Sequence, residues 1–385
     1  MIFTLVEITG LIILSILTVL TILNFVNIMS FKKVGSPVKA DFNNLISVLI
    51  PARNEEDTIE ECVNSVLNQT YKNFELIVLN DNSTDKTESI LNSISLKDNR
   101  LKIIKGKSLP ADWVGKNYAC HQLQMNSTGE YMLFLDSDTI MSEDCIYNSI
   151  NFAVKNNADL LSLMPYEETK TFWEKVIIPM LYFAVLVFLP LRMIERSKSK
   201  KYAMGNGQFM LFKKSFYDKI GGHEALKNRI VEDVWLARRT KEFGGKLIFA
   251  DGTDILKCRM YKNFNEVWNG FSKNFFAGLS FSVTGLILVN LLYLILFILP
   301  LFLLLYGLIV SNLFLIYISI ILIILPVIIR MSHSVYYKQP FWFSFLNILS
   351  SVMLILLSLN SFRIIRFGKG ANWKGRDYKE DTIKS

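Results

Sequence analysis

The chain has 385 residues, enough for one large domain or two ordinary ones, and 51% of them are hydrophobic, which is above the usual range for a soluble domain. The net charge is +8, and no basic stripe with regularly spaced aromatic residues stands apart from the apolar runs, which argues against a nucleic-acid-binding protein. The composition favours a membrane protein whose positive charge is attracted to anionic lipid.

The first predicted element is a transmembrane anchor over residues 1–31. Residues 8–29 carry no charge, and this is about the length that crosses a bilayer. No Lys or Arg precedes this run, whereas Lys32, Lys33 and Lys39 follow it, unlike a cleavable signal peptide with its basic start and shorter core. Because positively charged flanks stay in the cytoplasm, we expect a cell-membrane protein whose body is cytoplasmic.

The body, residues 42–278, alternates short β-rich segments with helical ones. The predicted strands lie in residues 45–56, 74–81, 101–106 and 131–138, and the predicted helices in residues 57–70, 83–94 and 116–127. This alternation with short links predicts an α/β, Rossmann-like domain with a mainly parallel sheet covered on both faces. In such sheets, ligands bind at the carboxyl ends of the strands.

Polar clusters follow three of the predicted strands: "PARNEE" (51–56), "NDNSTD" (80–85) and "DSD" (136–138). Alternation along a strand predicts that Asp136 and Asp138 share one side, with Ser137 on the other. Two carboxylates on one side suit Mn²⁺ or Mg²⁺, whose remaining ligands would be diphosphate oxygens and water. The structural alternative is a strand-end turn with capping aspartates.

The other polar residues near the strand ends also have two interpretations each. Glu55 suits ribose hydroxyls, and Arg53 suits phosphate or holds neighbouring acids in place. Asp81 could accept hydrogen bonds from a nucleobase or ribose, or form an Asx turn. Lys116, at the start of a predicted helix, could reach a diphosphate or could be an ordinary solvated residue at a helix end.

An internal apolar run over residues 176–194 has Pro179 near its start and Pro190 near its end, and basic residues follow it. We predict a pair of interfacial helices lying on the cytoplasmic leaflet. The alternative is a full span, which would put the two halves of the body on opposite sides of the membrane.

Residues 279–362 are predicted to be membrane-embedded, with apolar runs over 279–309, 313–329 and 341–359, followed by a basic tail over 363–385. Three full spans after a cytoplasmic body would leave that tail outside. The Lys and Arg residues of the tail favour the cytoplasm. We therefore expect one run to be re-entrant or interfacial and the tail to be cytoplasmic.

The motifs together resemble the family 2 glycosyltransferases, which have the GT-A fold. Besides the three clusters, the resemblance rests on "GKNYA" (115–119), "GNGQFMLFKKSFYDKIGGHEAL" (205–226) and "VEDVWLARRTKEFGG" (231–245). The anchor, the membrane segments and "ANWKGRDY" (371–378) are similar to bacterial enzymes that glycosylate membrane lipids such as carotenoid acids and hopanoids. The resemblance implies an inverting hexosyltransferase that moves a sugar, expected to be glucose, from a UDP-sugar to a membrane lipid.

The resemblance also implies a role for each matching position. The nucleotide sugar would contact Pro51, Arg53, Glu55, Asp81, Lys116 and Asp136, and Mn²⁺ or Mg²⁺ would be bound by Asp138 and Asp136. Asp233 would be the general base, with Glu232 beside it, and Gly207 and Gln208 would lie on the acceptor side. His223 could reach the metal or diphosphate, or could be a hydrogen-bonded structural residue.

One departure from the family concerns the Q-x-x-R-W motif of processive polysaccharide synthases, which does not occur in this sequence. The corresponding region, residues 258–278, offers Arg259, Trp268 and Lys273 to line an acceptor groove, although Trp268 could equally be an interfacial anchor. The leading hypothesis is thus addition of a single sugar. A processive synthase and a catalytically inactive membrane scaffold are the alternatives.

Overall fold

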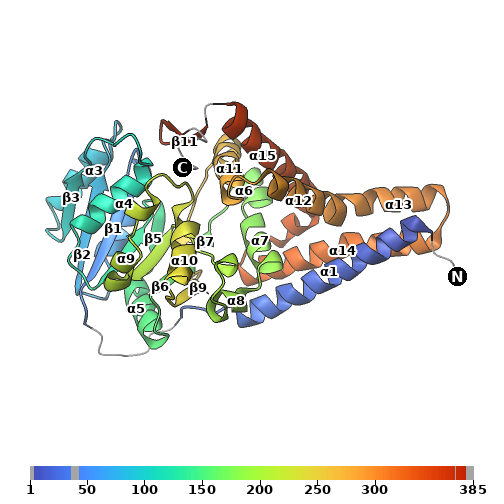
Figure 1. Ribbon diagram of the computed structural model, residues 1–385, viewed down its shortest axis with the longest axis horizontal. Helices are drawn as coiled ribbons and strands as arrows, with labels where there is room; N and C mark the ends of the chain where they lie inside the picture. The colour runs from blue at the N-terminus through green and yellow to red at the C-terminus, as the bar shows by residue number, and fades with distance from the viewer. Residues whose placement is uncertain (1–3, 36–42, 369, 379–385) are drawn as a thin grey trace. The chain divides into compact units, whose positions relative to one another are not determined.

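The computed structural model describes residues 4–35, 43–368 and 370–378. The chain divides into two compact units, each described by itself below. The helical unit consists of Met1–Ser30, Thr169–Leu191 and Tyr261–Gly368, and the sheet unit consists of Phe31–Glu168, Arg192–Met260 and Lys369–Ser385 (Figure 1).

The sheet unit contains a seven-stranded sheet in the order β3-β2-β1-β4-β8-β6-β9. Its strands are β1 (Ile46–Ala52), β2 (Phe74–Asn80), β3 (Leu101–Lys105), β4 (Tyr131–Leu135), β6 (Leu160–Met164), β8 (Phe209–Lys213) and β9 (Leu247–Asp251). All neighbouring strands are parallel except at β8, which is antiparallel to β4 and to β6. The predicted α/β architecture with a mainly parallel sheet is confirmed.

A smaller sheet in the order β5-β10-β7 lies in the same unit. Its strands are β5 (Thr139–Met141), β10 (Leu256–Cys258) and β7 (Tyr166–Glu167). Cys258 pairs in register with Thr139 on one side and with Glu167 on the other. Thr139 directly follows Asp138 in the chain. The small sheet therefore brings Glu167 close to the segment that follows β4.

Helices connect the strands of this unit, the first three of them close to the predicted ranges 57–70, 83–94 and 116–127. They are α2 (Ile59–Leu67), α3 (Thr87–Ser95), α4 (Gly115–Met125), α5 (Cys145–Lys155), α8 (Leu191–Arg196), α9 (Lys214–Lys219) and α10 (Glu232–Glu242), with the 3-10 helices η1 (Lys200–Tyr202) and η2 (Glu224–Leu226). In α2, Ile59, Val63 and Val66 are buried, as residues at helical spacing on one face should be.

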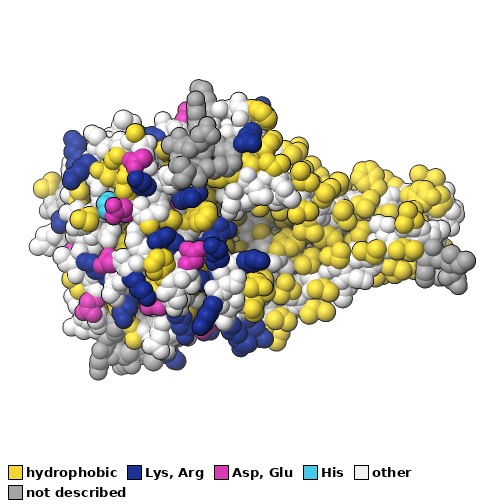
Figure 2. All heavy atoms as spheres, in the orientation of Figure 1, with side chains coloured by type: hydrophobic (Ala, Val, Ile, Leu, Met, Phe, Trp, Pro, Cys, Tyr) yellow, Lys and Arg dark blue, Asp and Glu magenta, His cyan; other side chains and the backbone are white. Residues whose placement is uncertain are grey.

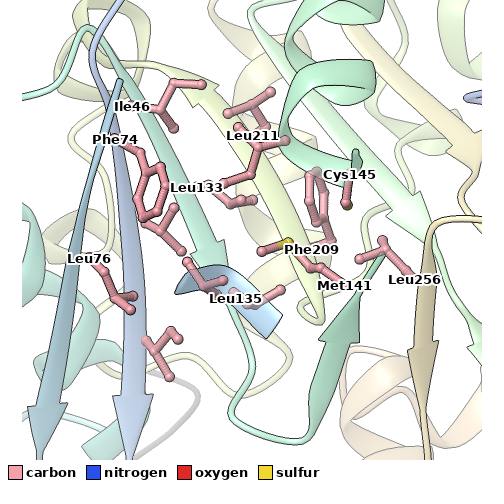
Figure 3. Packing of buried hydrophobic residues seen from close by; sticks show 14 of the residues in the cluster. Ile46, Phe74, Leu76, Leu133, Leu135, Met141, Cys145, Phe209, Leu211 and Leu256 are labelled. Atoms are coloured by element: carbon pink, nitrogen blue, oxygen red, sulfur yellow. The ribbon is translucent and has the colours of Figure 1, made fainter. Parts of the chain in front are cut away.

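The core of the sheet unit is formed by strand side chains and the helices that cover them (Figure 3). Every residue of β1 is buried, which is expected of a central strand covered on both faces. Leu133, Leu135, Phe209 and Leu211 come from the antiparallel pair β4 and β8 and belong to one apolar cluster with β1 and β2. This packing fixes the ends of β1, β2 and β4, where the polar clusters begin.

The end of β4 differs from the prediction. The strand stops at Leu135, and the amide of Thr139 donates to the carbonyl of Asp136 (3.1 Å), so "DSD" lies in a turn and strand alternation does not apply to it. Ser137 is nevertheless buried, while Asp136 and Asp138 are both partly exposed. In this turn, as in the predicted strand, the environment of Ser137 differs from that of the two carboxylates.

Among its described residues, the helical unit contains four helices that are long and apolar enough to cross a membrane: Leu5–Ser30, Val283–Ile309, Leu313–Tyr336 and Phe341–Phe367. They correspond to α1 (Leu5–Ser30), to α12 (Val283–Tyr293) with the π-helical η3 (Leu294–Ile298) and α13 (Leu299–Ile309), to α14 (Leu313–Tyr336), and to the 3-10 helix η4 (Phe341–Leu346) with α15 (Asn347–Phe367). Hydrophobic side chains gather along α13 and α14 in Figure 2, and many of them are exposed. Four such helices are consistent with membrane association.

The helical unit also contains α6 (Phe172–Ile177), α7 (Met180–Phe188) and α11 (Phe264–Gly278). The predicted interfacial segment 176–194 thus covers the end of α6, α7 and part of α8, broken at Pro179 and after Phe188. A single span here is excluded, because β6 before the segment and β8 after it are paired in one sheet. At nine residues, α7 is also far too short to cross a bilayer.

A hairpin that sequence reasoning missed belongs to the sheet unit. Its strands are β11 (Ala371–Trp373) and β12 (Arg376–Tyr378), which pair antiparallel in register. The sequence predicts a basic tail over 363–385 and marks "ANWKGRDY" (371–378) as a motif, but it does not predict this pairing. The part of the chain from 379 onward lies outside the described residues.

Candidate active site

Lys116 lies at the centre of a charged cluster at the carboxyl ends of the strands. It belongs to the first turn of α4, and its Nζ is 2.7 Å from Oδ1 of Asp136 and 2.8 Å from Oε1 of Glu232. Burial opposes the charged form of Lys116, but the two carboxylates outweigh it and raise the pKa of Lys116 well above its ordinary value. One cation thus joins "GKNYA", "DSD" and "VED", three predicted motifs that are far apart in the sequence.

Glu232 and Asp233 have opposite pKa shifts although they are adjacent. Burial favours the neutral form of Glu232, but Lys116 outweighs it and lowers the pKa of Glu232. Burial, followed by the negative charge of Glu232, raises the pKa of Asp233 to about 7. A carboxyl group with a pKa near neutrality is suited to accept and release a proton.

Gly207 brings the predicted acceptor-side loop against these acids. Its amide donates to Oδ2 of Asp233 (2.9 Å), and the amide of Val234 donates to Oδ1 (2.8 Å). A Cβ atom on Gly207 would meet Nζ of Lys116 at 3.2 Å and the carboxylates of Asp233 and Glu232 at 3.6 Å. A larger residue would therefore intrude on the space between the lysine and the two acids.

The backbone before these acids has an unusual conformation. Val231 has φ +60° and ψ +50°, in the left-handed region that a β-branched residue rarely adopts. This residue is the N-cap of α10 and places Glu232 and Asp233 in the first helical turn, where the helix dipole favours negative charge. Strain of this kind persists where the surrounding structure holds it, and it is commonly found at functional sites.

Asp138 has the features expected of a cation ligand. The Thr139 hydroxyl makes a long contact with its Oδ1 (3.4 Å), and no basic side chain in the described part of the chain forms an ion pair with it. Burial, then the charges of Asp136 and Glu55, raise the pKa of Asp138 to about 7. A hard divalent cation would relieve the cost of ionising this carboxylate, so the residues present fit Mn²⁺ or Mg²⁺.

Among the described residues, no group of three or more His, Cys, Asp or Glu side chains is arranged to hold a metal ion. Mg²⁺ is typically bound through one or two carboxylates, and substrate phosphates and water supply its remaining ligands. This arrangement of Asp138 with few other protein ligands is therefore compatible with an ion that arrives with a diphosphate.

Glu167 is a buried acid near the site that sequence reasoning missed. It is 2% exposed, and burial raises its pKa to about 8, with a hydrogen bond from Gln208 opposing the shift and the charge of Asp138 adding to it. Gln208, predicted on the acceptor side, is itself buried. The sequence signal was weak, because the two-residue strand within "YEE" (166–168) is too short for any periodicity to reveal it.

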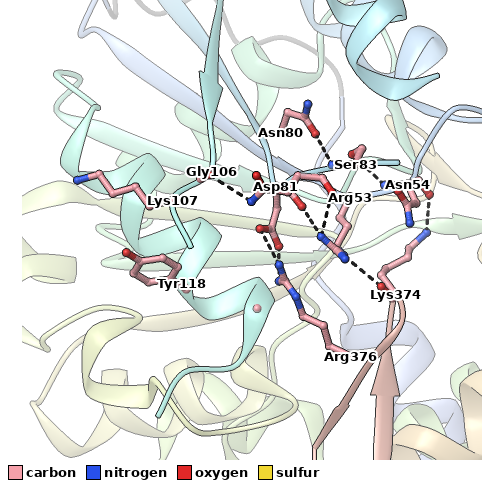
Figure 4. A network of polar contacts seen from close by, with 12 residues as sticks. Arg53, Asn54, Asn80, Asp81, Ser83, Gly106, Lys107, Tyr118, Lys374 and Arg376 are labelled. Carbon is pink, nitrogen blue, oxygen red and sulfur yellow. Dashed lines mark hydrogen bonds and ion pairs between the residues drawn. The ribbon is translucent and has the colours of Figure 1, made fainter. Parts of the chain in front are cut away.

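The nucleoside-binding residues predicted from "PARNEE" and "NDNSTD" lie together (Figure 4). Nη1 of Arg53 donates to the carbonyl of Asp81 (2.6 Å), so Arg53 holds the loop after β2. The Asx turn at this loop is made by Asn80, whose Oδ1 accepts from the amide of Ser83 (3.0 Å). The carboxylate of Asp81 is engaged instead by Arg376 of the hairpin (2.5 and 3.1 Å).

The remaining predicted residues are divided between the two units. Pro51 is buried in β1, in register with Leu79 of β2, and Arg259 follows β10 in the sheet unit. Trp268 and Lys273 belong to α11 of the helical unit, where the Trp268 ring lies 5.8 Å from that of Phe264. The sheet unit thus brings together the predicted donor and catalytic residues, but not these two acceptor-side residues.

His223 lies buried among aromatic side chains. Its ring is 2% exposed and lies 4.9 Å from the ring of Phe134, and its Nδ1 is 2.5 Å from the hydroxyl of Tyr217. Burial lowers its pKa to about 3. A neutral, enclosed imidazole supports the structural interpretation over a role at the metal or diphosphate.

Comparisons with known proteins concern the fold and the class of protein. Residues 47–221 match the family model described as glycosyl transferase family 2, so this part of the chain is similar to that family. The chain is similar to 4,4'-diaponeurosporenoate glycosyltransferase from Staphylococcus aureus (strain USA300), with 26% identity over 242 residues. That match covers 62% of this chain and 63% of the length of the relative.

One solved structure with a similar fold is the mannosyltransferase PcManGT from Pyrobaculum calidifontis, in complex with GDP-Man and Mn²⁺. Its TM-score is 0.53 at 14% sequence identity, covering 93% of this chain and 99% of that one. This likeness establishes a shared fold, which is that of the GT-A glycosyltransferases predicted from the motifs.

Replacing Lys116 with alanine is expected to destabilise the protein by about 2 kcal/mol at pH 7.5, because it leaves two partly buried carboxylates without their cation. The pKa of Glu232 is lowered in the folded state, so this stabilisation is present at neutral pH and is lost as the pH falls through that lowered pKa. Thermal unfolding of the wild type and the variant, measured from pH 7.5 to pH 4, should therefore show a difference that shrinks in acid.

The matched control is Lys257→Ala, which removes a lysine from an exposed pair with Glu61 (3.4 Å) and should change stability by less than about 0.5 kcal/mol. An equal loss of stability in both variants, or a difference between Lys116→Ala and wild type that does not depend on pH, would show that the Lys116 cluster is not the cause.

Proposed function

We propose that this protein is an inverting, metal-dependent glycosyltransferase that transfers one sugar, with glucose as the first candidate, from a UDP-sugar to a membrane lipid. The observation that carries the proposal is the bridge that Lys116 makes between Asp136 and Glu232. It joins a diphosphate-binding motif to a candidate catalytic acid pair at one edge of the sheet. The name of the Staphylococcus aureus relative, which is a glycosyltransferase for a carotenoid acid, supports a lipid acceptor.

The donor would lie across the ends of β1, β2 and β4. Asp81 and Glu55 would accept hydrogen bonds from the nucleoside, with Pro51 and Arg53 supporting the loop, and Asp136 would contact the ribose. Breaking the sugar–phosphate bond develops negative charge on the departing diphosphate, and Lys116 would stabilise that charge. Mn²⁺ or Mg²⁺ held by Asp138 and Asp136 would neutralise further phosphate charge when bound.

Asp233 would act on the acceptor. An attacking hydroxyl must lose its proton as it bonds to the sugar carbon, and Asp233, whose pKa is about 7, is suited to take that proton. Attack from the face opposite the diphosphate inverts the anomeric centre. If the acceptor is a carboxylic acid, it is already ionised near neutral pH, and Asp233 would instead orient it.

The acceptor would reach this site from the membrane. Four apolar helices are consistent with membrane association, and Lys32 and Lys33 directly after α1 favour a cytoplasmic sheet unit. Gly207, Gln208 and Arg259 would line the acceptor side in the sheet unit. Trp268 and Lys273 of α11 are candidates to contact the lipid.

The test uses the purified full-length protein in nanodiscs with bacterial lipid extract, MnCl2 or MgCl2, and UDP-glucose, UDP-galactose or UDP-N-acetylglucosamine in parallel. Nucleotide release and the mass of the lipid product are measured. One added sugar per lipid is the expected result. A long polymer would indicate a processive synthase, and no nucleotide release with any donor or lipid would indicate an inactive scaffold.

A further inference from the structure

The C-terminal hairpin, which we define as residues 370–378, has a turn suited to its position. Lys374 and Gly375 both have positive φ values, 48° and 85°, as in the two-residue turns whose twist matches that of paired strands. Trp373 pairs with Arg376, and Ala371 with Tyr378, across the turn. The hairpin belongs to the sheet unit, although 295 positions separate its Arg376 from Asp81 after β2.

The first contact of the hairpin with the donor side is a two-pronged ion pair. Nη1 of Arg376 is 2.5 Å from Oδ2 of Asp81, and Nη2 is 3.1 Å from Oδ1. The Asp81 side chain is only 4% exposed and that of Arg376 is 19% exposed. A buried carboxylate is costly without a partner, so the two bonds from Arg376 stabilise the position of Asp81 at the end of β2.

The second contact holds the loop after β1 (Figure 4). Nζ of Lys374 is 3.1 Å from Oε2 of Glu55 and donates to the carbonyl of Asn54 (3.1 Å). In return, Nε of Arg53 donates to the carbonyl of Lys374 (3.1 Å). Both carboxylates assigned to the nucleoside, Asp81 and Glu55, therefore have a basic partner from the same hairpin.

The third contact reaches the helix that carries Lys116. The amide of Gly115, in the first turn of α4, donates to the hydroxyl of Tyr378 (2.8 Å). The N-cap of this helix is Val114, whose side chain has no oxygen to accept from the first turn. The Tyr378 side chain, which is 6% exposed, supplies that acceptor from the hairpin.

We propose that the C-terminal hairpin is part of the donor-nucleotide site: Arg376 positions Asp81 for the nucleoside, and Tyr378 positions α4 and its Lys116 for the diphosphate. This inference rests on the proposed function, since it assumes that Asp81 and Lys116 bind the donor. A carboxylate offers about four lone-pair positions, and a guanidinium fork uses two of them. By this count, Asp81 bound to Arg376 would retain positions to accept a hydrogen bond from an N–H group of a base.

The experiment measures UDP binding by calorimetry, and donor KM and kcat, with the full-length protein in nanodiscs and MnCl2. Arg376→Ala is expected to weaken UDP binding and raise the donor KM by about 10- to 100-fold, with kcat at saturating donor changed by less than about 3-fold. Arg376→Lys keeps the charge but not the fork and should recover only part of the affinity. Tyr378→Phe, which removes only the acceptor oxygen, should raise the donor KM more modestly.

The matched control is Arg192→Ala, which removes an exposed arginine of the same unit and should leave UDP affinity unchanged. If wild-type protein binds UDP but Arg376→Ala binds it equally well or more tightly, the hairpin inference is overturned and the proposed function stands. The inference is also overturned if Arg376→Ala lowers only thermal stability. If the wild type neither binds UDP nor transfers sugar, the proposed function itself fails.

Discussion

Replacing Asp138 with alanine is expected to reduce metal-dependent sugar transfer by about 1,000-fold or more, while the protein remains folded in the membrane. This carboxylate lies in the turn after β4 and forms no ion pair with a basic side chain among the described residues. Its oxygen atoms are suitable ligands for a divalent cation. Loss of a metal that stabilises a departing diphosphate removes several kcal/mol of transition-state stabilisation, which corresponds to this factor. Titration of the rate with MnCl2 in both proteins provides the measurement.

The stability of the same variant distinguishes lost metal binding from unfolding. The pKa of Asp138 is raised to about 7 in the folded state, from an ordinary value of 3.8, so its ionisation costs stability as the pH rises from about 4 to 7. Without metal at pH 8, Asp138→Ala should therefore unfold at a temperature no lower than that of the wild type. Asp254→Asn, in an exposed pair with Lys33 (2.8 Å), is the control that should retain activity. Metal-dependent transfer retained by Asp138→Ala would refute this role.

Replacing Asp233 with asparagine is expected to lower kcat by about 100- to 10,000-fold when the acceptor attacks through a hydroxyl group. The amide keeps the shape and can still accept from the amide of Gly207, but it cannot take a proton. Because the pKa of Asp233 is raised to about 7, the wild-type rate should rise with pH up to about 7 and then level off, as the carboxylate becomes ionised. The variant should lack this dependence.

The pH series is measured at saturating metal, which keeps Asp138 ionised and removes its contribution to the profile. Asp218→Asn changes an exposed aspartate that accepts from Gln124 (2.8 Å), and it should retain the wild-type profile. An acceptor that is a carboxylic acid provides a further comparison, since it needs no base. If Asp233→Asn abolished transfer to such an acceptor without weakening its binding, a role limited to orienting the acceptor would be wrong.

The fold of the sheet unit was largely predictable, because its signals are local. Runs such as Ile46–Ala52 and Phe74–Asn80 are apolar along their whole length and end in polar clusters, which is typical of parallel strands with ligands at their carboxyl ends. Lys116 and Asp136 were expected at the donor and Glu232 beside the general base, and in the structure Nζ of Lys116 is 2.7 Å from Asp136 and 2.8 Å from Glu232.

Other features depend on contacts between distant residues and gave little local signal. The end of β4 at Leu135 is set by pairing with β8, which continues only to Phe209, so the turn at "DSD" could not be read from the sequence of that segment alone. The hairpin did leave one trace, a Lys-Gly pair between "ANW" and "RDY", but its partner Asp81 lies 295 positions earlier. Glu167 becomes buried only through pairing of β7 with β10.

The contact between Arg376 and Asp81 can form only late in the synthesis of the protein, because Arg376 is made 295 residues after Asp81. A ribosome adding about 5 to 20 residues per second needs roughly 15 to 60 seconds to cover the 295 positions between these two residues. In the last part of that interval, after β9 ends at Asp251, the seven strands of the main sheet are already made, while the carboxylate of Asp81 still lacks Arg376 and α4 still lacks its acceptor from Tyr378. If the hairpin serves the donor site as proposed, a nascent chain would have a folded sheet but weak affinity for nucleotide until the apolar helices have emerged and the hairpin has followed them.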